Sequence, residues 1–137
     1  MRRTAFLVGV LVITILSTGA CKSTPPEIPE GLSREELFQR AQEAVDRGDE
    51  QTALLYYQTV LERYPDDLEG RAAAEYEIAH IYYKQGLYGE AKELFLTILS
   101  YYDTQEGTSL PLWIKVLSEK HLSWIQEKEA EQEAQGS

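Results

Sequence analysis

The sequence predicts an all-α fold, on three observations. No segment alternates apolar and polar residues as a half-buried strand does. Ser33 and Glu36 have the spacing of a capping box, which marks the start of a helix. Gly48 and Gly86 each interrupt a helix-favouring run, and an alanine follows each of them five residues later. A glycine that recurs in this way indicates a turn between two helices. The two glycines lie 38 residues apart (86 − 48), and we call this separation the repeat offset.

The first hairpin is expected to consist of helices over residues 34–47 and 49–64. Leu32 and Leu37 have the spacing of a hydrophobic staple around the capping box. Gly48 ends the first helix, and Asp49 can cap the second. Pro65 stops the second helix because the residue before a proline disfavours the helical conformation.

The second hairpin is expected from residues 69–85 and 88–102, with Gly86 between them. Residues 103–109, "DTQEGTS", form a turn-rich break. A fifth helix then runs to about residue 131, with Pro111 tolerated in its first turn. The apolar side of this helix is expected to pack inward and comprises Leu110, Trp113, Val116, Leu117 and Trp124.

Residues 1–20 have the order of a secretory signal. Two arginines precede a largely apolar run over residues 5–16, which is short for a membrane span, and small residues follow. Cys21 comes next, so "LSTGAC" resembles a bacterial lipoprotein signal, in which the cysteine is lipidated and becomes the mature N-terminus. Thr18 replaces the aliphatic residue usual in that family. Cleavage after Ala20 without lipidation and an uncleaved anchor therefore stay open as alternatives.

Residues 21–31 are expected to form a lipid-anchored, proline-rich tether. The stretch "KSTPPEIPEG" has too many prolines for a helix and too few apolar residues to pack. In the best-known lipoprotein sorting scheme, the absence of Asp after the cysteine implies the outer membrane, and Lys22 stands there. The tether leads into a domain over residues 32–131, and residues 132–137 form a polar tail.

Residues 34–67 and 72–105 resemble the tetratricopeptide (TPR) repeat, a helix–turn–helix of about 34 residues. The matching residues are Leu37, Ala41, Ala44, Ala53, Tyr57 and Pro65 in the first, and Ile78, Ala79, Tyr82, Ala91 and Phe95 in the second. Arg40, Glu75, Asp103 and the extra residues over 68–71 depart from the pattern. The resemblance implies a short right-handed α-solenoid in which the fifth helix, residues 110–131, caps the second hairpin. "RYPDD" and the longer linker are similar to the subtype seen in outer-membrane assembly lipoproteins.

The same resemblance implies a partner-binding surface, because the first helix of each TPR hairpin lines the concave face. The corresponding residues are Phe38, Gln42, Val45, Tyr76, His80, Tyr83, Ile114, Ser118 and His121. Each helix contributes three residues at the spacing of one face. Two alternatives remain: Tyr76 and Tyr83 pad a short stack, or the fifth helix fills the groove.

Composition argues against several other classes of protein. The chain has 137 residues, a formal net charge of −10 and no basic face for nucleic acid. Its single cysteine excludes an internal disulfide and a cysteine-based zinc cage. Glu77 and His80 share a helix face, but the local spacing offers no third metal ligand, and His121 would have to approach from a neighbouring helix. Polar residues on an accessible groove are the favoured interpretation. With no nucleophile elbow and no phosphate loop, the sequence predicts neither catalysis, nor a cofactor, nor a metal.

The functional expectation is a lipid-anchored, non-enzymatic TPR protein that mediates protein–protein interactions in the bacterial cell envelope, as a scaffold or assembly factor. Its partners would be envelope proteins or peptides. Repeat stacks usually need about three repeats, and this chain has only two hairpins and one further helix. A second copy that completes the stack is therefore among the expected partners. The alternative function is a ligand-binding accessory lipoprotein of a periplasmic transport system.

Overall fold

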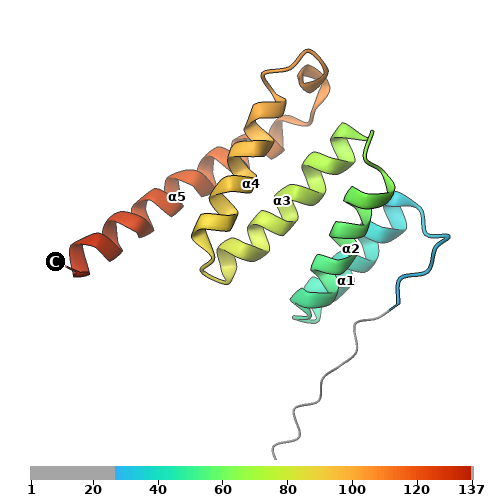
Figure 1. Ribbon diagram of the computed structural model, residues 1–137, viewed down its shortest axis with the longest axis horizontal. Helices are drawn as coiled ribbons and strands as arrows, with labels where there is room; N and C mark the ends of the chain where they lie inside the picture. Colours follow the sequence, from blue (N-terminus) through green and yellow to red (C-terminus); the bar gives the residue numbers. More distant parts are fainter. Residues whose placement is uncertain (1–26, 137) are drawn as a thin grey trace, which may run out of the picture.

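The protein is an array of helices packed side by side (Figure 1). The computed structural model describes residues 27–136, and every regular element within that range is helical. The elements are α1 (Arg34–Asp46), α2 (Glu50–Arg63), α3 (Leu68–Lys84), α4 (Tyr88–Tyr101), the 3₁₀ helix η1 (Glu106–Ser109) and α5 (Leu112–Gly136). The all-α prediction is confirmed. The expected signal, Cys21 and the start of the tether lie outside the described residues.

The predicted ends of the first four helices lie within one residue of those observed. The fifth helix differs, because it continues to Gly136 rather than ending near residue 131. Pro111 lies just before this helix rather than inside its first turn, and its carbonyl accepts a hydrogen bond from the Ile114 N–H at 3.1 Å. None of the described helices is both long enough and apolar enough to cross a bilayer.

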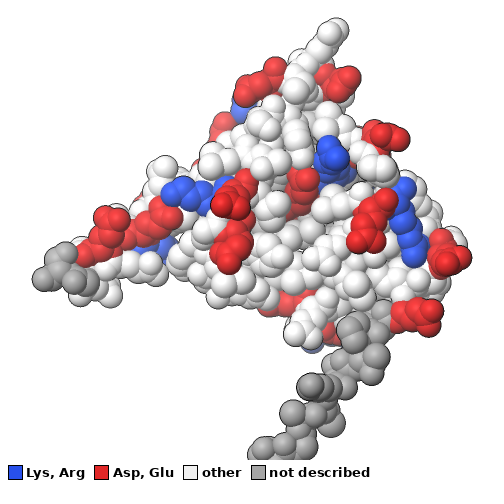
Figure 2. All heavy atoms as spheres, viewed as in Figure 1, with Lys and Arg blue, Asp and Glu red and all other residues white. Residues whose placement is uncertain are grey.

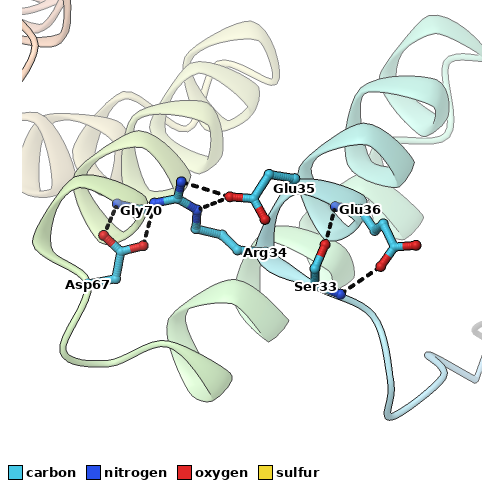
Figure 3. Close-up of polar contacts among 6 residues, drawn as sticks. All are labelled: Ser33, Arg34, Glu35, Glu36, Asp67 and Gly70. Carbon is cyan, nitrogen blue, oxygen red and sulfur yellow. Dashed lines mark hydrogen bonds and ion pairs between the residues drawn. The ribbon is translucent and has the colours of Figure 1, made fainter.

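The start of α1 is fixed by the capping box and by an ion pair to the next hairpin (Figure 3). The Glu36 N–H donates to Ser33 Oγ at 3.2 Å, and the Ser33 N–H donates to the Glu36 carboxylate at 2.8 Å. Arg34 donates to Asp67, whose carboxylate caps α3 by accepting from the Gly70 N–H at 3.0 Å. These contacts set the first turn of α1 against the first turn of α3.

The two hairpins turn in the same way. The N–H groups of Gly48 and Asp49 donate to the carbonyls of Val45 and Ala44. Gly86 and Leu87 repeat this pattern with Tyr83 and Tyr82. Both glycines have positive φ, 73° and 77°, as the Schellman motif requires. The glycine spacing in the sequence therefore identified both turns.

The core consists of two clusters that meet at α3. The first cluster is built mainly by α1 and α2 around Leu37, Tyr57 and Val60, and the second by α3, α4 and α5 around Phe95 and Ile98. Tyr82 packs against both clusters. Four alanines that match the repeat pattern are completely buried, namely Ala41, Ala53, Ala79 and Ala91.

The prediction of which face of the fifth helix packs inward was largely wrong. Trp113, Val116 and Trp124 are exposed, although Leu110 is buried and Leu117 is half-buried as expected. The face that packs against α3 and α4 instead carries Ile114, Ser118, His121 and Ile125. Compact side chains on this face allow the helices to approach closely. Each indole ring lies at the margin, where its N–H can remain in water.

Candidate interaction surface

Helices α1, α3 and α5 contribute to one continuous surface. Gln42 of α1 hydrogen-bonds to Glu77 of α3. The Tyr76 ring, from the residue before Glu77, meets Trp113 of α5 edge-on, with centroids 5.5 Å apart. The Tyr83 ring lies 6.2 Å from Trp124 of α5. The first helices of the two hairpins and the fifth helix are thus neighbours, as the repeat pattern predicts.

The nine residues predicted to bind a partner divide into an accessible and a buried group. Gln42 is exposed, and four others are half-buried: Phe38, Val45, His80 and Tyr83. The remaining four are buried: Tyr76, Ile114, Ser118 and His121. The expectation of an open surface is therefore wrong for these four. The fifth helix fills this end of the surface, as one of the two alternatives anticipated.

We call the accessible group the inner strip: Phe38, Gln42, Val45, His80 and Tyr83. Phe38 packs edge-on against the buried Tyr57, and Tyr83 packs against Tyr88, His121 and Trp124. Gln42 also donates to the Tyr57 hydroxyl. These contacts hold the side chains in place while leaving part of each accessible, which suits recognition by preorganised aromatic groups.

His121 is the centre of an aromatic cluster at the end of the inner strip. Its ring stacks on Phe95 with centroids 4.9 Å apart, and Tyr76, Tyr83 and Trp124 surround it edge-on. His121 Nε2 lies 3.1 Å from His80 Nδ1. The residue is only 4% exposed. His121 therefore joins α5 to α3 and α4 instead of presenting its ring to a partner.

The hydrogen bonds assign the protons of the two rings. His121 Nδ1 lies 2.8 Å from the Leu117 carbonyl, which can only accept, so this nitrogen carries the proton. Nε2 of a neutral His121 then accepts from the Nδ1–H of His80. Burial lowers the pKa of both histidines. The positive charge of Lys84 lowers the pKa of His80 further, and that of Lys120 does the same for His121.

Two glutamates beside the strip are held in partly dehydrated positions. Burial raises the pKa of Glu77, and the hydrogen bond with Gln42 opposes that rise. Burial also raises the pKa of Glu75, whose carboxylate accepts from the Tyr101 hydroxyl at 2.7 Å. Glu75 stands where the TPR pattern usually has tryptophan, and this bond to α4 gives it a structural role within the second hairpin.

The described residues contain no group of three or more His, Cys, Asp or Glu side chains arranged to hold a metal ion. In particular, His80 and His121 bond to each other, and Glu77 is engaged by Gln42. Both nitrogens of His121 are already occupied by hydrogen bonds. The arrangement is that of an interhelical polar contact within an aromatic cluster.

Sequence reasoning missed the two tryptophans as surface residues. Trp113 and Trp124 lie eleven positions apart on one face of α5, but so do Ile114 and Ile125 on another. Helical periodicity alone does not show which of two apolar stripes on one helix is buried. A useful signal was that the tryptophan stripe includes Lys120, whereas the isoleucine stripe contains no formally charged residue.

No protein-family model matches the chain, and no solved structure matches it. A protein of Treponema pallidum (strain Nichols), described as uncharacterised, is 40% identical to it over 94 residues. The aligned region covers 67% of this chain and 38% of the relative. The chain thus spans well under half the length of that relative.

Proposed function

We propose that this protein is a lipid-anchored, non-enzymatic TPR module that binds other proteins of the bacterial cell envelope through its inner strip. The observation that carries the proposal is the accessible part of α1 and α3. Phe38, His80 and Tyr83 are preorganised there but only half-buried. Partly accessible aromatic groups on a rigid helical scaffold favour recognition of a peptide or protein segment.

The identical turns of the two hairpins support the assignment to the TPR type. Their glycines are related by the repeat offset and make the same pair of backbone hydrogen bonds. Tyr57 and Phe95 are related by the same offset, and both are completely buried. A repeat of this kind places equivalent helices in a row, and such rows form extended binding surfaces.

The proposed attachment rests on Cys21 and the segments beside it. Acylation at this cysteine would anchor the chain, and the proline-rich tether would hold the helical domain away from the bilayer. The abundance of acidic side chains on the face shown in Figure 2 gives no electrostatic attraction to anionic lipids. The acyl chains would therefore supply the membrane affinity, in the outer membrane under the usual sorting scheme.

Attachment is tested by Cys21→Ser. We expect the wild-type chain to carry lipid by mass spectrometry and to fractionate with membranes, and the variant to be soluble. If the wild type carries no lipid and the variant still fractionates with membranes, the anchor is not at Cys21.

Binding is tested by photocrosslinking in living cells from two exposed glutamines. A photoreactive residue at Gln42 lies on the inner strip, and one at Gln58 lies on α2 as a matched control. We expect Gln42, but not Gln58, to crosslink to a distinct envelope protein, and Tyr83→Ala to reduce that yield at least about tenfold. Equal yields from both positions, or a yield unaffected by Tyr83→Ala, would exclude the inner strip as the binding surface.

A further inference from the structure

Helix α5 has two apolar faces, and α3 and α4 cover only one of them. We call the other face the outer stripe: Trp113, Val116, Lys120 and Trp124. Trp113 is 47% exposed and Val116 is 51% exposed. Six large apolar side chains are exposed in residues 27–136, and four of them belong to α5: Leu112, Trp113, Val116 and Trp124. Such a concentration on one helix is typical of an interaction surface.

The repeat spacing indicates what normally covers this stripe. One repeat offset before Trp113 and Lys120 lie Glu75 and Tyr82 of α3, which contact α4 and its core cluster. One further offset back lie Leu37 and Ala44 of α1, which are completely buried in the cluster shared with α2. At these two positions, α1 and α3 are covered by the antiparallel second helix of their hairpin. Val116 instead corresponds to Ile78, which packs in the first core cluster, and to Arg40, which is exposed. Helix α5 runs on to Gly136 without such a partner in the described chain.

We propose that the outer stripe is a homodimer interface, on which α5 of a second copy packs antiparallel. A two-fold axis across a helix makes the two copies of that helix antiparallel, which is the direction of the covering helix in each hairpin. The stripe is suited to pairing with itself, because it has a tryptophan near each end and Val116 between them. Antiparallel pairing places Trp113 of each copy beside Trp124 of the other.

The charges of α5 favour a second copy in this direction. The first turn of α5 contains no acidic residue, whereas Glu127 and Glu131 continue the outer stripe beyond Trp124. In the antiparallel pair these carboxylates lie toward the N-terminal end of the other α5, where the helix dipole is positive. Parallel pairing would set the same carboxylates against one another. The last turns of α5 also project past α3 and α4, which leaves them accessible to another chain (Figure 1).

The outer stripe lies on α5 and the inner strip on α1 and α3, and the two meet where the Tyr83 ring lies 6.2 Å from Trp124. Lys120 already lies over its own Trp124, with the ammonium 4.8 Å from the ring centroid, so its aliphatic stem adds apolar area to the stripe. Each copy carries a formal net charge of −10, and the copies therefore repel each other at long range. We expect moderate salt to strengthen the dimer because it screens this repulsion.

The first test measures the mass of the full chain in mild detergent by sedimentation equilibrium, under reducing conditions so that Cys21 cannot link copies. We expect a dimer for the wild type and a largely monomeric Val116→Glu. This variant should weaken association at least about 30-fold, or about 2 kcal/mol. Leu96→Glu is the matched control, because Leu96 of α4 is 52% exposed and lies outside the stripe. Circular dichroism should show both variants folded.

A monomeric wild type over a wide concentration range would overturn the proposal. So would a Val116→Glu variant that dimerises like the wild type, or a Leu96→Glu variant that dissociates equally.

The second test asks whether Lys120 lies near the two-fold axis, as the proposed antiparallel pairing requires. In a Cys21→Ser background, Lys120→Cys should give a disulfide-linked dimer on mild oxidation, because this position lies near the proposed two-fold axis. Leu96→Cys should remain monomeric under denaturing, non-reducing conditions. If the Lys120→Cys chain dimerises but forms no disulfide link, the antiparallel pairing is excluded.

The third test places a photoreactive residue at Val116 in cells. We expect a product of twice the mass of the chain that contains only this protein. A product with a different protein in place of the homodimer would show that another partner covers the stripe, and would overturn the proposal. The crosslinks from Gln42 report on the inner strip, so either proposal can fail while the other stands.

Discussion

At the scale of single residues, His121 determines how α5 meets the hairpin before it. Its ring stacks on Phe95 from α4, and its two nitrogens contact His80 and the Leu117 carbonyl. A neutral imidazole can satisfy all of these contacts, because it offers one donor and one acceptor on a flat aromatic ring. A protonated His121 would present a second N–H toward the Nδ1–H of His80, so the bond between the rings would persist only if His80 moved its proton to Nε2.

The first prediction follows from the lowered pKa values of these two histidines. Burial in the folded protein lowers each pKa below its usual value of 6.5, so folding favours the neutral rings. This stabilisation is present above the pKa of the unfolded chain and is lost as the pH falls through the lower pKa values of the folded protein. We expect the wild-type Tm to fall more between pH 7 and pH 5 than the Tm of His121→Phe, which keeps a ring on Phe95.

The comparison with His121→Phe is needed because Glu75 and Glu77 act in the opposite direction. Burial raises the pKa of both carboxyl groups, so their contribution to stability diminishes as the pH rises. Both glutamates remain in the variant, and the difference between the two pH profiles isolates the histidine. Parallel profiles for the two proteins would contradict the assignment of neutral, coupled rings.

Ser118 gives a second prediction at this scale. Its side chain is completely buried, and the hydroxyl has no hydrogen-bond partner. An unsatisfied buried hydroxyl costs about 1 kcal/mol or more. Ser118→Ala should therefore raise the free energy of unfolding by about 1 kcal/mol, measured by urea denaturation. Ser123→Ala is the control, because Ser123 is exposed and its replacement should change stability little. A loss of stability on Ser118→Ala would mean that the hydroxyl has a stabilising role.

At the scale of elements, the turns depend on two backbone positions. Gly48 and Gly86 adopt positive φ, and the N–H groups of each glycine and the next residue satisfy carbonyls at the helix end. The break between α4 and α5 uses a glycine for another reason. A Cβ at Gly107 would lie 1.8 Å from the Tyr101 carbonyl oxygen, so the chain can pass this helix end only without a side chain.

The third prediction compares two nearby glycines, one in the turn and one in the helix after it. Gly86→Ala should cost about 1 kcal/mol, because an alanine is strained at positive φ even though space is open around it. Gly89 lies within α4 in open surroundings, so Gly89→Ala should stabilise the protein by about 0.5 kcal/mol. Thermal unfolding of both variants tests this, and changes of the same sign would contradict the turn assignment.

At the scale of the whole molecule, the position of α5 completes the second core cluster. Ile114 and Ile125 are completely buried there, together with Phe95 and Ile98. Without this helix, the second hairpin would expose that side of its core. A stack of two hairpins is short for a repeat protein, and the single additional helix supplies the missing burial.

The fourth prediction tests which face of α5 points inward. Ile114→Ala should lower the free energy of unfolding by about 3 kcal/mol, through lost burial and the cavity left behind. Val116→Ala, two positions later, should change it by less than about 0.5 kcal/mol at protein concentrations low enough to keep the chain monomeric, because Val116 is exposed in the single chain. Chemical denaturation gives both values. A larger loss of stability for Val116→Ala than for Ile114→Ala would show that the face expected from the sequence packs inward.

The sequence by itself determined the elements and their order. Capping residues, turn glycines and prolines act within a few residues of their own position, and these signals located the first four helices to within one residue. The repeat offset also determined which residues are equivalent in the two hairpins. The nine candidate binding residues came from the resemblance to the TPR repeat, and five of them are accessible.

Only the tertiary structure decided the rotation of α5 about its axis and the burial of Tyr76. Helix α5 carries two apolar stripes, and helical periodicity does not decide which of them is buried. The choice depends on the shape of the surface offered by α3 and α4. That surface accepts Ile114, Ser118 and His121 at close range and leaves the broad indole rings at the margin. Burial of Tyr76 follows from that docking, because its ring is enclosed only when α5 brings Trp113 and His121 against it.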